Sequence, residues 1–336
     1  MDEVVVISPE IRPGEGGLAD YTLRVLEEWG DRARVRLVVP AKQSFAEELP
    51  RDRGNILLQY SAYGFDPLGY PRWLLHSLGD WKRSTTGSLL VVMFHEIWTF
   101  WPLLNKNRLV QSLHRRDIRK LISVADAVFT STPSQAEHLR ELAPTCAMQV
   151  LPVGANIRRT APMDGQREEG VAVLFGLAGV RVRALRTMHA DMKSLAAQNL
   201  LTRLISIGNG SAPEEEQLLG DLRLAGGFEQ RGALPEAEVS QILARATFGI
   251  SAQDELSLMK SGTFMAYAAH ALNILSPYAD SLGPEPLCWL THPRELREGI
   301  SHNELNSRAE SLRQWQERTS SWSEIAARFA EALQLA

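Results

Sequence analysis

The sequence predicts an α/β protein made of two doubly wound parallel sheets, each with helices on both of its faces. Short apolar runs rich in β-branched residues alternate with amphipathic stretches through both halves of the 336-residue chain. A polar segment rich in glycine and charged residues, 154–170, separates the two series and indicates a linker. A chain of this length ordinarily forms two domains.

The first half opens with Val4–Ser8, a run typical of a buried parallel strand. A glycine loop, 13–17, follows it, and apolar spacing then predicts a helix over 18–29. Thr132 and Pro133 are suited to cap and begin a later helix. The further elements expected in this half are strands at 35–39, 55–59, 88–94, 127–130 and 149–153, and helices at 108–124 and 133–142.

The second half repeats the alternation and ends in about 40 helical residues. Ligands of such sheets bind at the carboxyl ends of the strands, so two facing sheets predict a cleft that holds the chemistry. The expected elements are strands at 171–175, 203–207, 227–231, 247–251 and 273–275, and helices at 182–199, 214–225, 236–244 and 261–271.

Composition narrows the functional classes. The net charge of -4 argues against a nucleic-acid partner, which usually calls for a basic excess. Cys146 and Cys288 lie far apart and show no metal-ligand spacing, so no metal is expected. The sequence starts without a signal peptide and contains no run of 18 apolar residues, which predicts a cytoplasmic protein with no transmembrane segment and leaves room for peripheral membrane contact.

The run Lys260-Ser261-Gly262-Thr263 stands between a strand and a helix. The first turn of a helix offers unpaired N–H groups and the positive end of the helix dipole, which together attract anions. Gly262 allows close approach of the backbone, the hydroxyls of Ser261 and Thr263 add donors, and Lys260 adds charge. The alternative is an ordinary helix cap beside an exposed lysine.

Other polar residues are expected at strand ends. His95 and Glu96 follow the strong strand 88–94, where a histidine can hydrogen-bond a sugar hydroxyl or share a proton, or simply pack. Trp98 comes just after and can stack on a sugar or belong to the core. Tyr70, Trp73 and His76 likewise either line an acceptor pocket or pack.

Arginines and glycines complete the candidates. Arg181 and Arg183 follow a strand and a glycine turn, a place suited to diphosphate recognition, although solvated surface arginines fit equally. The loop containing Gly16 and Gly17 lacks the full dinucleotide fingerprint, so we expect its backbone to face a reacting sugar or to form a simple tight turn.

Taken in order, these features resemble the GT-B glycosyltransferases of family 4, over nearly the whole chain. The resemblance is carried by the first glycine loop, the strand-end histidine, the passage into the linker, the start of the second domain, its second glycine-bearing strand end and the closing helix. In this sequence they are Gly14–Tyr21, His95, 125–130 with 151–157, Val173–Gly176 with Arg181 and Arg183, 207–210, and Ser321-Trp322 with Ile325-Ala326.

The resemblance implies two Rossmann-like domains that face each other across a cleft, with a C-terminal helix crossing back to the N-terminal domain. It implies an acceptor-side domain over 1–155, completed by about 316–336, and a donor-binding domain over 156–315. The implied activity is that of a retaining, metal-independent, hexosyltransferase-like enzyme. It would move a sugar from a nucleotide diphosphate sugar, with UDP or GDP as the favoured nucleotide, to a small-molecule or glycan acceptor, without a cofactor.

The site residues follow from the same resemblance and from the reasoning above. Catalytic roles are expected for His95, Lys260 and Arg181, and acceptor contacts for Asp20, Glu96 and Trp98. The expected donor-binding residues are Gly16, Gly17, Arg183, Gly208, Asn209, Glu255, Ser261, Gly262 and Thr263.

One departure from the family concerns its usual pair of glutamates near the donor. Alignment through Ala271 puts Ala266 and Leu258 at those positions, and Asp254 and Glu255 are the candidates for a displaced carboxylate. The segment resembles instead a branch with a Lys/Arg-Ser-Gly-Ser/Thr motif. The alternatives are therefore an altered GT-B member, such as a nucleotide-sugar epimerase or hydrolase, a non-catalytic sugar-nucleotide binding subunit, or a nicotinamide-dependent oxidoreductase.

Overall fold

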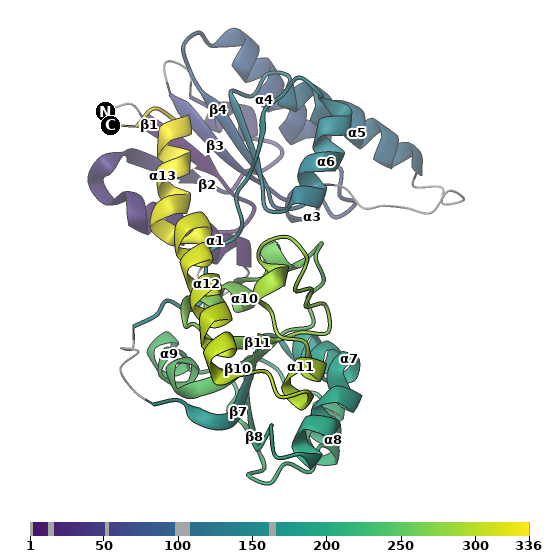
Figure 1. Cartoon of the computed structure of the whole chain (residues 1–336). Helices are drawn as coiled ribbons and strands as arrows, with labels where there is room; N and C mark the ends of the chain where they lie inside the picture. The colour runs from purple at the N-terminus through teal and green to yellow at the C-terminus, as the bar shows by residue number, and fades with distance from the viewer. Residues whose placement is uncertain (1–2, 13–16, 51–53, 98–107, 161–165, 336) are drawn as a thin grey trace. The chain divides into compact units, whose positions relative to one another are not determined.

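The computed structural model describes residues 3–12, 17–50, 54–97, 108–160 and 166–335. The chain divides into two compact units, which we call unit 1 (residues 1–153 and 322–336) and unit 2 (residues 154–321). Each unit contains one sheet whose strand pairs are all parallel, with helices between successive strands (Figure 1). The α/β class and the two Rossmann-like sheets expected from the sequence are confirmed.

The sheet of unit 1 has the order β2-β1-β3-β4-β5-β6. The chain runs outward from β1 to β2, then returns to the other side of β1 for β3, so the order reverses between β1 and β3. Every residue of β3 and β4 is buried, as expected for strands covered on both faces. The strands are β1 (Glu3–Ile7), β2 (Arg34–Val38), β3 (Asn55–Tyr60), β4 (Leu90–Phe94), β5 (Ala127–Thr130) and β6 (Met148–Val150).

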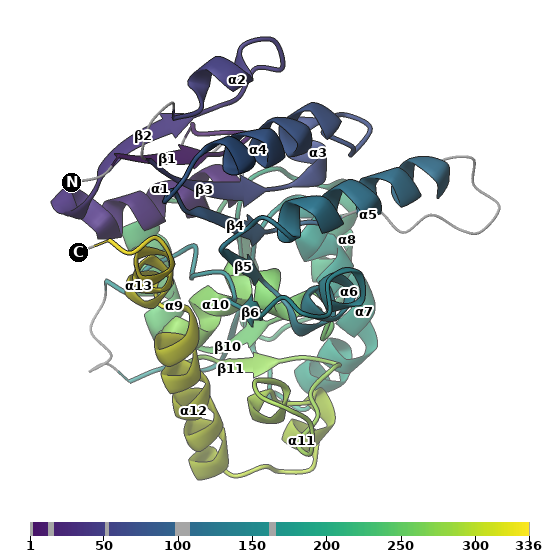
Figure 2. The same ribbon diagram turned by 90° about the horizontal axis from the view of Figure 1, so that it is seen from above.

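Two helices from opposite ends of the chain cover one face of this sheet. They are α1 (Gly17–Trp29) and α13 (Trp322–Ala332), which lie side by side (Figure 2). The indole Nε1 of Trp29 donates to the carbonyl of Ala326 at 2.9 Å, and Phe329 is fully buried against the sheet. The last helix is therefore part of unit 1. The other face is covered by α2 (Phe45–Glu48), α4 (Arg72–Ser84), α5 (Arg108–Ile122) and α6 (Pro133–Leu142).

The sheet of unit 2 has the order β11-β10-β7-β8-β9, which reverses between β7 and β10. Helices α7, α8 and α11 pack on one face, while α9 and α10 lie on the other (Figure 1). Helix α12 packs against the edge strand β11 and against α10. The strands are β7 (Glu168–Phe175), β8 (Arg203–Ile207), β9 (Phe228–Gln230), β10 (Ala246–Ile250) and β11 (Asn273–Leu275). The helices are α7 (Ala178–Ala197), α8 (Pro213–Asp221), α9 (Glu236–Arg245), α10 (Gly262–Ala269), α11 (Pro293–Arg297) and α12 (His302–Ser320).

Every strand expected from the sequence has its counterpart here, and the differences concern helices and boundaries. Helix α7 begins at Ala178, four residues before the expected start, and β7 begins at Glu168, inside the expected linker. Helices α2, α4 and the short α3 (Ala62–Phe65) were not predicted. None of the helices in the described parts of the chain is long and apolar enough to cross a membrane.

Helix and sheet pack closely in unit 2 at Gly249, where a Cβ atom would lie 2.7 Å from the ring of Tyr267. We expect Gly249→Ala to lower the free energy of unfolding by about 1–3 kcal/mol, because the ring is buried and has no room to move. Gly220→Ala on α8 is the matched control, since nothing lies within 4 Å of its Cβ position. The control should stabilise slightly. Chemical denaturation measures both, and equal stabilities would contradict the packing argument.

Candidate functional site

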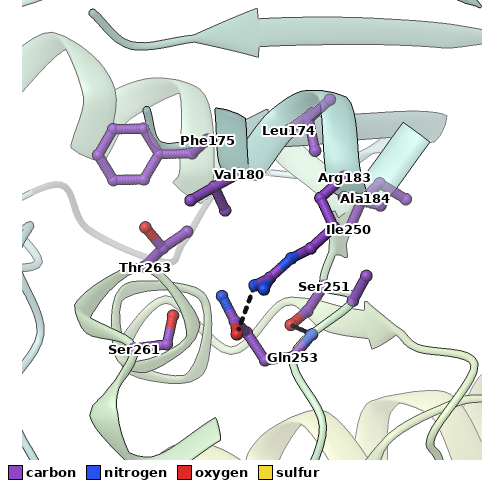
Figure 3. Close-up of a pocket in the computed structure, with 11 residues that line it drawn as sticks. Leu174, Phe175, Val180, Arg183, Ala184, Ile250, Ser251, Gln253, Ser261 and Thr263 are labelled. Atoms are coloured by element: carbon purple, nitrogen blue, oxygen red, sulfur yellow. Dashed lines mark hydrogen bonds between the residues drawn. The ribbon is translucent and has the colours of Figure 1, made fainter. Parts of the chain in front are cut away.

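The candidate site of unit 2 lies where the strand order reverses, at the carboxyl ends of β7 and β10. In open parallel sheets this is the place where the loops from neighbouring strands turn to opposite faces and leave a crevice. A pocket occupies it, bounded by α7 on one side and the start of α10 on the other (Figure 3). Its lining residues are Leu174, Phe175, Val180, Arg183, Ala184, Ile250, Ser251, Ala252, Gln253, Ser261 and Thr263.

The start of α10 forms the polar wall of this pocket. The Oγ of Ser261 accepts a hydrogen bond from the backbone N–H of Phe264 at 3.2 Å, so Ser261 caps the helix, as the alternative interpretation of this run expected. The hydroxyls of Ser261 and Thr263 are both at the pocket in Figure 3. Gly262 packs closely on Asn156: a Cβ at position 262 would lie 3.0 Å from Asn156 Cβ, so a larger residue there would require Asn156 to shift slightly.

Tyr267 fixes α10 to the two strands that hold the pocket. Its buried hydroxyl donates to the carbonyl of Val173 at 3.1 Å and accepts from the N–H of Phe175 at 2.8 Å. Burial raises the pKa of Tyr267 well above its ordinary value, so the hydroxyl stays protonated and can play both parts. The absence of a side chain at Gly249 allows the ring to lie on β10. Sequence reasoning missed this residue; the signal was a tyrosine within the otherwise apolar, buried run Phe264–Ala268.

Arg183 supplies the cation at the pocket. It is exposed on α7, and its Nη2 donates to Oε1 of Gln253 at 2.9 Å (Figure 3). Gln253 Oε1 also accepts from the hydroxyl of Ser257 at 2.9 Å. The expected donor residue Arg183 is therefore in the candidate site, together with Gln253, which the sequence analysis did not single out.

Two other residues of the predicted site are near in sequence but do not line the pocket. Lys260 is exposed and ends the 3-10 turn Leu258–Lys260, one residue before the cap of α10. Glu255 is exposed in the loop after β10. The Lys260-Ser261-Gly262-Thr263 run thus contributes its two hydroxyl residues to the pocket wall, while Lys260, the residue before Ser261, does not line it.

The expectation that Arg181 faces a diphosphate needs correction. Its side chain is 3% exposed and forms a two-pronged ion pair with the fully buried Glu215. Its remaining donors are taken by backbone carbonyls of the turns after β7 and β8. A guanidinium has five N–H donors, and all five have acceptors here, so none is left for a ligand.

Gly208 and Asn209 belong to the second of these turns. Gly208 has a φ of +138°, and a Cβ atom there would overlap the carbonyl oxygen of Gly176 at 1.9 Å. Asn209 accepts from the N–H of Ala178 at 3.2 Å through its backbone carbonyl. Neither residue lines the pocket, so the geometry gives both a part in shaping the turns around Arg181.

In unit 1 the carboxyl edge of the sheet carries a buried polar cluster around His95. The Nε2 of His95 and Oε1 of Gln59 are 2.6 Å apart, and the carbonyl of His95 accepts from Gln135 Nε2 at 3.1 Å. The ring of Tyr21 meets the imidazole edge to face, with centroids 4.7 Å apart. His95 is therefore held firmly at a strand end, as expected, with only 9% of its surface exposed.

The other unit 1 candidates lie apart from this cluster or outside the described residues. Glu96 is exposed and accepts from the hydroxyl of Ser61 at 2.9 Å. Gly17 begins α1, and Asp20 is exposed in its first turn. Gly16 and Trp98 lie outside the residues that the structure describes.

The aromatic and histidine candidates for an acceptor pocket pack within unit 1. The hydroxyl of Tyr70 donates to Asp117, which also lies 3.2 Å from Nε2 of His76. Trp73 stacks edge to face on the buried Phe45, with ring centroids 5.4 Å apart. Burial raises the pKa of Tyr70 to about 12. These contacts favour the packing alternative and tie α4 to its neighbours.

Exposed apolar side chains mark the same edges of both sheets. In the part of the chain that the structure describes, each large hydrophobic residue with high exposure lies at the end of a strand or in the connection to the next element, which for Tyr63 is the short helix α3. These residues are Val39, Tyr63, Leu68 and Val150 in unit 1, and Leu177, Leu256, Tyr278 and Leu282 in unit 2.

Comparisons with known proteins define the fold. No protein-family model matches the sequence, and no curated protein matches it either. The structure is similar to a glycosyltransferase from Rickettsia africae ESF-5, with a TM-score of 0.63 and 10% identity over 100% of this chain and 99% of that one. It is also similar to sucrose-phosphate synthase from Thermosynechococcus elongatus, with a TM-score of 0.59 and 11% identity over 99% and 98%.

A third similar structure is WaaG, described as a glycosyltransferase involved in lipopolysaccharide biosynthesis, with a TM-score of 0.52 and 14% identity over 99% of this chain and 100% of that one. Matches that span both chains nearly end to end show that the chain has the GT-B fold of these glycosyltransferases. At such low identities the likeness concerns the fold, and site residues must be argued from this chain alone.

Two buried histidines make stability depend on pH. Burial lowers the pKa of His114 to about 4 and that of His270 to about 4, so both are neutral in the folded protein. In the unfolded chain they take up protons near pH 6.5. The free energy of unfolding should thus be level above that pH and fall between about pH 6.5 and 4, by at most about 1.4 kcal/mol per pH unit for each histidine.

Urea unfolding at pH 7, 6 and 5 measures this dependence, with His114→Gln and His270→Gln each expected to flatten it. His302→Gln is the control, because His302 is exposed at the start of α12. A pH dependence that persists unchanged in both buried-site variants would contradict the assignment.

Proposed function

We propose that the protein is a glycosyltransferase that moves a sugar from a nucleotide diphosphate sugar to a small-molecule or glycan acceptor. The observation that carries the proposal is the pocket at the β7/β10 switch point, walled by the start of α10 and by Arg183. The fold shared with glycosyltransferases supports it. UDP and GDP are the nucleotides that we favour.

The proposed donor site is electrostatically suited to a diphosphate. The first-turn N–H groups of α10 and the positive end of its dipole favour negative charge, and the hydroxyls of Ser261 and Thr263 add neutral donors. Arg183 adds a full charge within the pocket, and Lys260, the residue before Ser261, adds another. None of the described residues that line the pocket is acidic, so nothing there repels the ligand.

In the proposed reaction the bond between the anomeric carbon and the diphosphate oxygen breaks, and a bond to the acceptor oxygen forms. The acceptor proton passes to the leaving phosphate, and the configuration is retained. Donors that are already oriented toward the departing oxygen lower the barrier most, because they need no rearrangement as charge develops. We assign the acceptor side to unit 1 and give His95 the task of hydrogen-bonding the donor sugar.

A non-catalytic or altered GT-B member, such as a sugar-nucleotide binding subunit, epimerase or hydrolase, is the second candidate. The observation that favours it is Ala266, a buried alanine in α10 at the position aligned with one of the family's usual glutamates. Nucleotide-sugar binding without transfer to any member of a broad acceptor panel would favour a binding subunit. Sugar release or isomerisation without an acceptor would favour a hydrolase or an epimerase.

Nucleotide affinity provides the first test. Thermal-shift screening with UDP, GDP, ADP and TDP should reveal at least one ligand, and calorimetry then gives its Kd. Arg183→Ala and Lys260→Ala should each weaken binding, by about tenfold for Arg183, because a charge-assisted contact to phosphate is lost. Arg186→Ala is the control, since Arg186 is exposed on α7 but pairs with Glu214 on α8. Failure of all four nucleotides to bind the wild-type protein would contradict the proposed donor.

Metal independence provides the second test. The proposal assigns stabilisation of the leaving diphosphate to the helix start and to cationic side chains. Turnover of the donor with its acceptor should therefore be unchanged when a strong chelator is added. The assay compares initial rates with and without chelator and with added Mg²⁺ or Mn²⁺. A large loss of rate in chelator that either metal restores would contradict this part of the mechanism.

A further inference from the structure

We propose that the buried ion pair between Arg181 and Glu215 is a positioning device for the pocket of unit 2. This proposal rests on the proposed function, because the ligand is taken to be a nucleotide diphosphate. In this role Arg181 never touches the ligand. It fixes the turn after β7, and this turn determines where the pocket residues on either side of it lie.

Arg181 connects three chain segments at one point. Its Nε and Nη2 each lie 2.8 Å from a different carboxylate oxygen of Glu215, which belongs to α8. Its Nη1 donates to the carbonyls of Gly176 and Asn209, and its Nη2 donates to the carbonyl of Gly210 at 2.8 Å. The planar guanidinium thus holds the turns after β7 and β8 in one fixed relation to each other.

Glu215 is held equally firmly. Burial alone would raise its pKa, but hydrogen bonds from Arg181 and from the hydroxyl of Ser206, with a further contribution from Gln230, hold the pKa below its usual range. The carboxylate is therefore charged at neutral pH. An ion pair with this many hydrogen bonds has one low-energy geometry, which makes it a rigid support and not merely an attraction between charges.

The turns that Arg181 holds pack closely against each other and depend on glycine at two positions. A Cβ at Gly208 would meet the Gly176 carbonyl and would also lie 2.8 Å from Nη1 of Arg181. Gly176 itself has a φ of +136°, a conformation that other residues rarely adopt. The two glycines thus let the backbone close around the guanidinium.

The held turn is directly continuous with the pocket. Phe175 precedes Gly176 and Val180 follows it within one turn of α7, and both side chains line the pocket (Figure 3). A Cβ atom added at Gly176 would lie 3.6 Å from the Oγ1 of Thr263, so the turn is close to the start of α10. A shift of the Gly176 turn would therefore move the wall opposite the start of α10.

The pair is not needed simply to join α7 to α8. The same helices are joined by an exposed ion pair between Arg186 and Glu214, and by buried apolar contacts that include Leu185 and Leu219. The turn carbonyls are different, because no other described side chain is shown donating to those of Gly176 and Gly210. Asn209 and Gly210 are exposed and Gly176 is half-buried, so water can replace Arg181 as donor while the fixed geometry is lost.

The decisive comparison is between two paired substitutions on the same two helices. Arg181→Met with Glu215→Met removes the buried pair without leaving an unpaired charge, and such replacements are often tolerated. Arg186→Met with Glu214→Met is the matched control at the exposed pair. For each variant we would measure thermal unfolding, hydrogen exchange of the segment 175–180, and the Kd for whichever of UDP, GDP, ADP and TDP binds the wild type most tightly.

The buried-pair variant should remain folded, exchange faster over 175–180, and bind the nucleotide at least about tenfold more weakly. The control should match the wild type in exchange and affinity. A folded buried-pair variant with wild-type Kd would overturn the proposal while leaving the proposed function intact. Absence of binding by the wild type would instead refute the proposed function.

If the double methionine variant does not fold, Arg181→Lys decides the question. A lysine keeps the charge opposite Glu215 but has three donors in place of five, so it cannot span the carboxylate and the three carbonyls. It should weaken nucleotide binding and speed exchange over 175–180 more than it lowers the unfolding temperature. Wild-type affinity in this variant would overturn the proposal.

Discussion

The hydroxyl of Tyr267 is the contact on which the candidate site depends. It bonds both the carbonyl of Val173 and the N–H of Phe175, so it ties α10 to the end of β7, near the place where the pairing of β7 with β10 ends. A buried hydroxyl must satisfy its hydrogen bonds, which leaves α10 a single position relative to the strand. Gly249 makes the approach possible. An interaction inside the core therefore positions the start of α10 at the pocket, together with its capping hydroxyl and first-turn N–H groups.

The two walls of the pocket differ in polarity and in what holds them in place. The α10 wall is a helix start, whose polar groups face outward because a helix cannot satisfy its own first N–H groups. The α7 wall is apolar apart from Arg183, and its shape is set from behind by a buried ion pair and two glycine turns. Polar groups that are held by the fold, and not by the ligand, lose little freedom on binding, which is the physical advantage of such an arrangement.

Periodicity predicted most of the fold, because strands that are buried on both faces produce unbroken apolar runs, as in β4. The cap at Ser261 was the alternative interpretation of its motif, and it could be read from the sequence because a cap depends on local residues alone. Periodicity did not predict features that depend on residues distant in the sequence. The role of Tyr267 depends on its hydrogen bonds to β7, and helix α4 is stabilised by contacts that involve Trp73, Phe45 and Tyr70. No local pattern encodes which remote atoms a side chain will meet.

The two arginines of α7 show how a small boundary error changes a functional assignment. With the helix expected from residue 182, Arg181 and Arg183 could both precede or begin it and face the same ligand. With the helix beginning at Ala178, they lie two positions apart within it, and residues so spaced project about 200° apart. One must then face the sheet and the other the opposite side. Arg181 is buried against Glu215 and supports the turns around the pocket. Arg183 is exposed at the pocket, where it can contact a ligand.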